Sequence, residues 1–184
     1  MKTRALIIHG HIGCGKTQRA LELAERAKQS GYRVLGLVSL RVTDGGETTG
    51  YTGMDLASGA RFPLVKLTSL AEGEDWRKLG KWKYSFSEAG FEIANTILED
   101  AAKALDNETI VVADEYGHIE LLGLGIHRGV TRVAEALEHG GYLVVLCRTD
   151  KVDAVVKILP ESASVLVAEA DRPDFWRSLR DWFN

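Results

Sequence analysis

The chain has 184 residues, of which 45% are hydrophobic and 27% charged, and its formal net charge is −3. This size and composition are typical of one compact globular domain, which we expect to span residues 1–184. The acidic balance argues against a broad nucleic-acid surface, the two widely separated cysteines argue against a disulfide framework, and no apolar run is long enough to span a bilayer. We therefore expect a cytoplasmic protein that binds neither nucleic acid nor membrane.

Strands and helices are expected to alternate along most of the chain. Short apolar runs predict buried strands, and apolar residues at helical spacing predict amphipathic helices. The expected strands cover residues 5–9, 33–42, 109–115, 142–147 and 164–169, and the expected helices cover 16–30, 87–105, 126–139, a segment from about 151 and a segment after Pro173. This order predicts an α/β fold with a mostly parallel sheet and helices on both faces.

An insertion with a different pattern is expected at about residues 41–67. Asp44-Gly45-Gly46 and Ser58-Gly59 are turn sequences between short strand-like runs, so this segment predicts antiparallel hairpins. Residues 68–87 carry tryptophans among charged side chains and predict no regular element.

A glycine-rich loop follows the first expected strand. Gly10, Gly15, Lys16 and Thr17 match G-x-x-x-x-G-K-[ST], and the strand before and helix after them supply the required context. Backbone N–H groups in such a loop and at the helix N-terminus bind phosphates, and bare glycines allow close approach. The residues expected to bind a nucleoside triphosphate are Gly10, Ile12, Gly13, Cys14, Gly15, Lys16, Thr17 and Gln18. The alternative is a glycine-rich turn with a surface lysine.

Two acids end the buried strand in "TIVVADEYGHIEL". We expect Asp114 to support Mg²⁺ together with the Thr17 hydroxyl. Glu115 is the candidate general base for an attacking water, and Lys16 is expected to contact the β- and γ-phosphates. The alternative is that both acids simply face solvent at a strand end. The five histidines show no zinc-binding spacing.

Four arginines are candidates for stabilising charge in the transition state, although each can equally have a structural role. They are Arg41, Arg128, Arg148 and Arg172.

Three stretches resemble the cancer-related nucleoside-triphosphatases and their thermophilic prokaryotic relatives. "GHIGCGKTQ" is similar to that family's phosphate loop, "ADEYGHIELL" to its Asp-Glu-Ile-Gly-x-Met-Glu-Leu signature, and "GLVSLRVTDGGETTGYTGMDLASG" to its hairpin segment. The resemblance spans most of residues 3–147. It implies a RecA-like P-loop NTPase sheet that hydrolyses NTP to NDP and phosphate, with Mg²⁺ and a loose preference between ATP and GTP.

The resemblance also implies roles for individual residues. Lys16 and Thr17 would contact phosphate and Mg²⁺, Asp114 would support the metal, and Glu115 would activate water. Arg172 would lie beside the base, but Asp171 stands where the family has Asn, which puts base preference in doubt.

Two other functions use the same loop. A nucleotide or small-molecule kinase would need an acceptor pocket and a basic lid, for which residues 68–87 offer Arg77, Lys78, Lys81 and Lys83. A nucleotide-gated binding module could present the hairpins to a protein partner.

Overall fold

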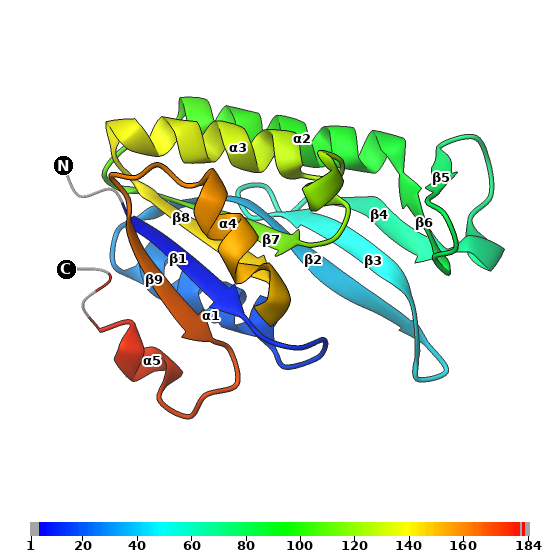
Figure 1. Cartoon of the computed structure of the whole chain (residues 1–184), viewed down its shortest axis with the longest axis horizontal. Coiled ribbons are helices and arrows are strands. Elements are labelled where there is room, and N and C mark those ends of the chain that lie inside the picture. Colours follow the sequence, from blue (N-terminus) through cyan, green and yellow to red (C-terminus); the bar gives the residue numbers. More distant parts are fainter. Residues whose placement is uncertain (1–3, 181, 183–184) are drawn as a thin grey trace.

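The protein folds around one mixed sheet, as a computed structural model that describes residues 4–180 and 182 shows (Figure 1). The sheet has nine strands in the order β5-β6-β4-β3-β2-β7-β8-β1-β9. The strands are β1 (Arg4–His9), β2 (Arg33–Asp44), β3 (Glu47–Asp55), β4 (Arg61–Leu67), β5 (Trp76–Lys78), β6 (Tyr84–Ser87), β7 (Thr109–Tyr116), β8 (Tyr142–Cys147) and β9 (Ser164–Glu169).

The sheet divides into a parallel and an antiparallel half. β2, β7, β8, β1 and β9 are parallel neighbours, whereas β3, β4, β6 and β5 continue from β2 with antiparallel pairing. The antiparallel half is larger than expected, because β6 pairs with β4 and carries the hairpin region on to Ser87 instead of ending near residue 67.

Helices cover both faces of the sheet, as predicted. α1 (Lys16–Gln29) and α5 (Phe175–Ser178) pack on one face, and α2 (Glu88–Lys103), α3 (His127–Ala136) and α4 (Val152–Ile158) pack on the other (Figure 1). Side chains alternate along β1: Ala5 and Ile7 join the α2–α4 core, while Leu6 and Ile8 join the α1 core. This two-sided burial explains why the parallel strands read as continuous apolar runs. The expected α/β architecture is confirmed.

Local start and stop signals also lie where the sequence predicts them. The Ser87 hydroxyl caps α2 by accepting a hydrogen bond from the Gly90 N–H at 2.9 Å. Gly31 follows α1 with a φ of 88°, a left-handed conformation that ends helices.

Gly36 is required where β2 crosses closest to β7. Its φ is 94°, and a Cβ there would overlap the carbonyl oxygen of Val112. We expect Gly36→Ala to lower the free energy of unfolding by about 2–3 kcal/mol, measured by chemical denaturation. Gly31→Ala is the matched control, because Gly31 has a similar φ of 88° but open space around it. If both variants lose the same free energy of unfolding, the positive φ and not the overlap with Val112 would explain the destabilisation.

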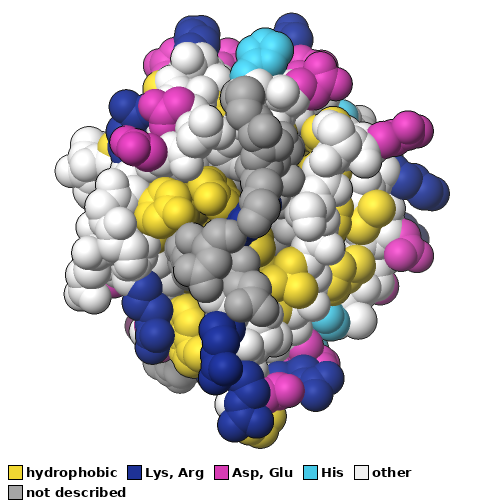
Figure 2. Space-filling view, turned by 90° about the vertical axis from the view of Figure 1, so that its left-hand side faces the viewer, with side chains coloured by type: hydrophobic (Ala, Val, Ile, Leu, Met, Phe, Trp, Pro, Cys, Tyr) yellow, Lys and Arg dark blue, Asp and Glu magenta, His cyan; other side chains and the backbone are white. Residues whose placement is uncertain are grey.

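The end of the molecule that carries both termini lies opposite the carboxyl ends of the parallel strands (Figure 1). On this end, hydrophobic side chains gather toward the middle of the face, and most acidic and basic side chains lie around its edges (Figure 2). None of the helices in the described part of the chain combines the length and hydrophobicity needed to cross a bilayer.

Candidate functional site

The loop between β1 and α1 presents bare backbone beside a fixed ammonium group. Gly13 and Gly15 have φ values of 84° and 90°, which other residues rarely adopt. Lys16 is only 8% exposed, and its Nζ donates to the carbonyl oxygens of Gly10 and His11 at 3.2 and 2.9 Å. These bonds hold the positive charge against the loop, where an anion can engage it.

A cavity of about 290 Å³, here called the loop cavity, brings most of the predicted phosphate-binding residues together. It is lined by Ile12, Gly13, Gly15, Lys16, Thr17, Gln18, Leu21, Ser39, Leu40, Arg41, Tyr51 and Glu115. Gly10 and Cys14 do not line it: Gly10 is buried, and Cys14 packs against the α1 core.

Asp114 is joined directly to the loop. The Thr17 hydroxyl donates to its Oδ2 at 2.7 Å, and the Ser39 backbone N–H donates to the same oxygen at 3.0 Å. The other oxygen, Oδ1, is buried and has no hydrogen-bond partner among the described residues. Burial, followed by the charge of Glu115, raises the pKa of Asp114 to about 7. Asp114 is therefore a buried carboxyl group with one oxygen that has no hydrogen-bond partner among the described residues.

A β-bulge in β7 gives the adjacent residues Asp114 and Glu115 different surroundings. The pairing with β8 shifts between Ala113 and Tyr116, so that β7 gains one residue relative to its neighbour. Glu115 sits in this bulge with a φ of 74°, the only positive φ of a non-glycine residue in the described ranges. As a result Asp114 is buried beside Thr17, whereas Glu115 projects into the space in front of Lys16.

Glu115 lies among cations. Burial by the surrounding protein raises its pKa, and the positive charges of Lys16, Arg41 and Arg148 oppose this effect. Arg41 comes from β2 and lies against Gly13 of the loop, and Arg148 directly follows β8. Arg41 also lines the loop cavity, and both arginines lie close enough to Glu115 to lower its pKa.

The other two candidate arginines lie elsewhere. Arg128 forms ion pairs with Glu92 and Glu99 on the surface of α2 and α3, each at 2.7 Å. Arg172 pairs with Asp174 at 3.0 Å and lines a separate cavity of about 220 Å³. Contact between Arg172 and the base remains a prediction.

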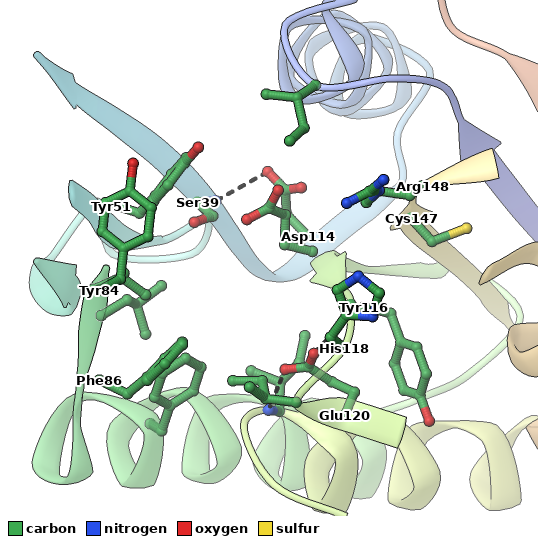
Figure 3. Close-up of a pocket in the computed structure, with 18 of the residues that line it drawn as sticks. Ser39, Tyr51, Tyr84, Phe86, Asp114, Tyr116, His118, Glu120, Cys147 and Arg148 are labelled. Atoms are coloured by element: carbon green, nitrogen blue, oxygen red, sulfur yellow. Dashed lines mark hydrogen bonds between the residues drawn. The ribbon is translucent and has the colours of Figure 1, made fainter. Parts of the chain in front are cut away.

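A second cavity, of about 260 Å³, adjoins the loop cavity at Lys16 and Glu115. Here called the aromatic cavity, it is lined by Tyr51, Trp82, Tyr84, Phe86 and Phe91, by aliphatic side chains, and by the acids of β7. Figure 3 shows Tyr51, Tyr84 and Phe86 on one side of Asp114, with Arg148 on the other.

The segment 68–87 does not form a basic lid over the loop cavity. None of Arg77, Lys78, Lys81 and Lys83 lines either cavity, and Arg77 instead pairs with Glu88 at 2.7 Å. The segment contributes aromatic rings because β6 alternates, and Tyr84 and Phe86 face the cavity.

Sequence reasoning missed two residues that shape the site. Ser39 fixes Asp114 through its backbone, which no side-chain pattern reveals. Glu120 is 2% exposed and accepts hydrogen bonds from the backbone N–H groups of Gly117 and Ile126 at 2.8 and 3.2 Å. It thereby holds the loop after β7, which forms one wall of the aromatic cavity; its place in the quoted signature was the available clue.

The sheet order, the glycine loop and the linked acid can now be compared with known proteins. The family profile described as NTPase matches residues 5–177. The chain belongs to the NTPase family. This result confirms the family resemblance that the sequence indicated.

Two curated relatives of this NTPase illustrate the similarity. Nucleoside-triphosphatase THEP1 of Methanopyrus kandleri is 27% identical over 161 residues, which cover 88% of this chain and 83% of the relative. Nucleoside-triphosphatase THEP1 of Methanocaldococcus jannaschii is 30% identical over 115 residues, which cover 62% of each chain.

The fold of this NTPase also matches a solved structure. The solution structure of a human cancer-related nucleoside triphosphatase superposes with a TM-score of 0.68 over 99% of this chain and 95% of that chain. At 22% identity, the match establishes the P-loop NTPase fold.

Proposed function

We propose that this NTPase hydrolyses nucleoside triphosphates to diphosphate and inorganic phosphate in a Mg²⁺-dependent reaction. The observation that carries the proposal is the bond of 2.7 Å between the Thr17 hydroxyl and Asp114, which joins the phosphate loop to the acidic strand beside Glu115. The composition favours a cytoplasmic location, without nucleic acid or membrane as partners.

The donor set around Asp114 suits Mg²⁺. A carboxylate and a hydroxyl are hard oxygen ligands, and the buried Oδ1 lacks a partner among the described residues. No group of three or more His, Cys, Asp or Glu in the described part of the chain could hold a metal. Mg²⁺ is usually held by one or two protein ligands, with phosphate oxygens and waters completing its coordination shell. Bound there, Mg²⁺ would neutralise charge on the phosphates.

The chain's own residues would perform the remaining tasks. The loop N–H groups and Lys16 would bind and orient the triphosphate. Glu115 would accept the proton of the attacking water, and Arg41 and Arg148 would stabilise the charge that develops on the leaving diphosphate and the transferred phosphoryl group.

Loose base preference is supported by the mixed lining of the loop cavity. Leu21 and Leu40 offer apolar surface there, and Gln18 and Arg41 offer flexible polar groups. Apolar surface packs against either purine, so we propose that ATP and GTP are both substrates.

Product analysis tests the proposal. With Mg²⁺, the protein is expected to release equimolar NDP and phosphate from ATP and GTP at rates within about tenfold of each other, and EDTA is expected to stop the reaction. Turnover that persists in EDTA would contradict the metal dependence. A preference for one base well beyond tenfold would contradict the loose selection.

The raised pKa of Asp114 predicts how stability depends on pH. Its folded pKa of about 7 lies above the ordinary value of 3.8, so between these values the folded state holds more protons than the unfolded state. Stability of the metal-free protein therefore falls as pH rises through this window, and is lowest above pH 7. We expect Asp114→Asn to remove this part of the decrease, on the order of 2 kcal/mol.

Thermal unfolding between pH 5 and 8, with and without Mg²⁺, measures this effect. Added Mg²⁺ should stabilise the parent at pH 8 but not Asp114→Asn. Asp153→Asn, an exposed position on α4, is the matched control and should behave like the parent. Equal Mg²⁺ stabilisation in all three proteins would place the metal elsewhere.

A further inference from the structure

The aromatic cavity is separate from the phosphate site but opens onto it. It shares Lys16, Ser39 and Glu115 with the loop cavity, together with Ile12 and Tyr51, but is lined by neither Thr17 nor the glycines of the loop. Asp114 and Glu115 line it beside Lys16. A molecule in this cavity would therefore face the terminal phosphate from the side of the proposed general base.

Hydrolysis does not explain the size of this space. An attacking water needs a site of only about 10–15 Å³ of probe volume, whereas the cavity measures about 260 Å³. This volume is slightly below the range of about 300–1,000 Å³ for sites of drug-sized ligands, so the cavity suits a smaller occupant of one or two rings.

The walls define the chemistry of this occupant. The outer part is built from aromatic rings: Trp82 lies 5.7 Å from Phe86 and 6.2 Å from His118 between ring centroids, and Phe86 lies 6.2 Å from Phe91. Such walls favour a flat ring that can stack.

The positive side chains of the lining lie near Glu115, and the other titratable lining residues are Asp114, His118 and Glu120. Lys16 and Arg148 are the lysine and arginine among the lining residues, and both act on Glu115. Figure 3 shows Arg148 across Asp114 from the tyrosines. An acidic group on the occupant would meet no lysine or arginine among the rings. Glu120 already accepts a backbone N–H hydrogen bond on each of its carboxylate oxygens, so it does not call for a basic group, and an uncharged occupant fits best there.

We propose that the aromatic cavity is a second substrate site, which binds a small uncharged aromatic or heteroaromatic alcohol and places its hydroxyl where water otherwise attacks. The proposal rests on the proposed function, because it uses the same triphosphate and the same Glu115. The segment 68–87 then supplies the acceptor pocket through Trp82, Tyr84 and Phe86 instead of a basic lid.

The transfer balances without any further reactant. The alcohol oxygen forms a bond to the γ-phosphorus, and the bond from that phosphorus to the β–γ bridging oxygen breaks, with its electron pair leaving on the nucleoside diphosphate. Glu115 takes the hydroxyl proton. The products are a phosphate monoester and NDP, and hydrolysis is the reaction that remains when the cavity holds only water.

Binding is tested with four probes: benzyl alcohol, 3-hydroxymethylpyridine, 5-hydroxymethylpyrimidine and 1-naphthylmethanol. With Mg²⁺ and ADP present, ligand-observed NMR should show saturable binding of at least one probe. Trp82→Ala should weaken it at least tenfold, and because Trp82 is 38% exposed, its loss should not prevent folding. Trp76→Ala is the matched control: Trp76 lies in the same antiparallel region but contacts Lys66 outside the cavity.

Transfer is tested with the bound probe and Mg²⁺-ATP, using ³¹P NMR to separate phosphate monoester from inorganic phosphate. Monoester should form, and Trp82→Ala should lower the ratio of monoester to phosphate. Absence of saturable binding by every probe, binding that Trp82→Ala leaves unchanged, or inorganic phosphate as the sole product each overturns the second site while hydrolysis stands. Absence of both phosphate products instead overturns the proposed hydrolysis, and the acceptor role with it.

Discussion

Replacing Glu115 with glutamine is expected to lower kcat about 10²–10³-fold while leaving nucleotide affinity near that of the parent. Glutamine has the same shape but cannot accept the proton of the attacking water. It also leaves the contacts of Lys16 and Thr17 in place, since neither side chain bonds to Glu115. Steady-state phosphate release gives kcat, and calorimetric titration with a non-hydrolysable ATP analogue gives Kd.

The control for this experiment is Glu161→Gln, an exposed glutamate in the turn before β9. It should match the parent in both measurements. A Glu115→Gln variant that turns over at the parental rate would remove Glu115 as the base, and the bulge would then need another explanation.

Replacing Lys16 with methionine is expected to raise the Kd for ATP about 10²–10³-fold. Methionine keeps most of the aliphatic stem but removes the ammonium group, and each charge-assisted hydrogen bond contributes about 1.5–3 kcal/mol. The lost bonds are those that Nζ would make to phosphate, in place of the carbonyl oxygens of Gly10 and His11 that it now contacts. Calorimetric titration of the variant measures the change directly.

Lys103→Met on α2 is the matched control for the loss of one positive charge, because Lys103 pairs with Asp100 on the surface and lines neither cavity. Its Kd should equal that of the parent. If both variants bind ATP equally well, the nucleotide does not occupy the loop cavity.

Much of the fold could be predicted because its signals are local. Each parallel strand is buried on both faces, so residues 109–115 and 142–147 read as apolar runs whatever their neighbours are. The phosphate loop is equally local: its glycines, Lys16 and Thr17 follow one another along the chain, and the structure brings Thr17 to Asp114 as the motif implies.

The features that escaped prediction depend on distant partners. The bulge at Glu115 exists only relative to β8, and Ser39 matters only because β2 lies beside β7. Residues 68–87 looked irregular because Trp82, Tyr84 and Phe86 face a cavity whose other walls come from β3, β7 and α2. No periodicity within the segment itself could reveal those walls.

The backbone conformation at Glu115 opposes thermal stability to catalytic turnover. A φ of 74° strains the backbone of every residue except glycine, and asparagine is strained less than most other residues. Laboratory evolution that rewards heat resistance alone is expected to accept such residues at position 115, and the variant would then lack the proposed general base. Selection for turnover, by contrast, is expected to keep glutamate at this position despite the strain.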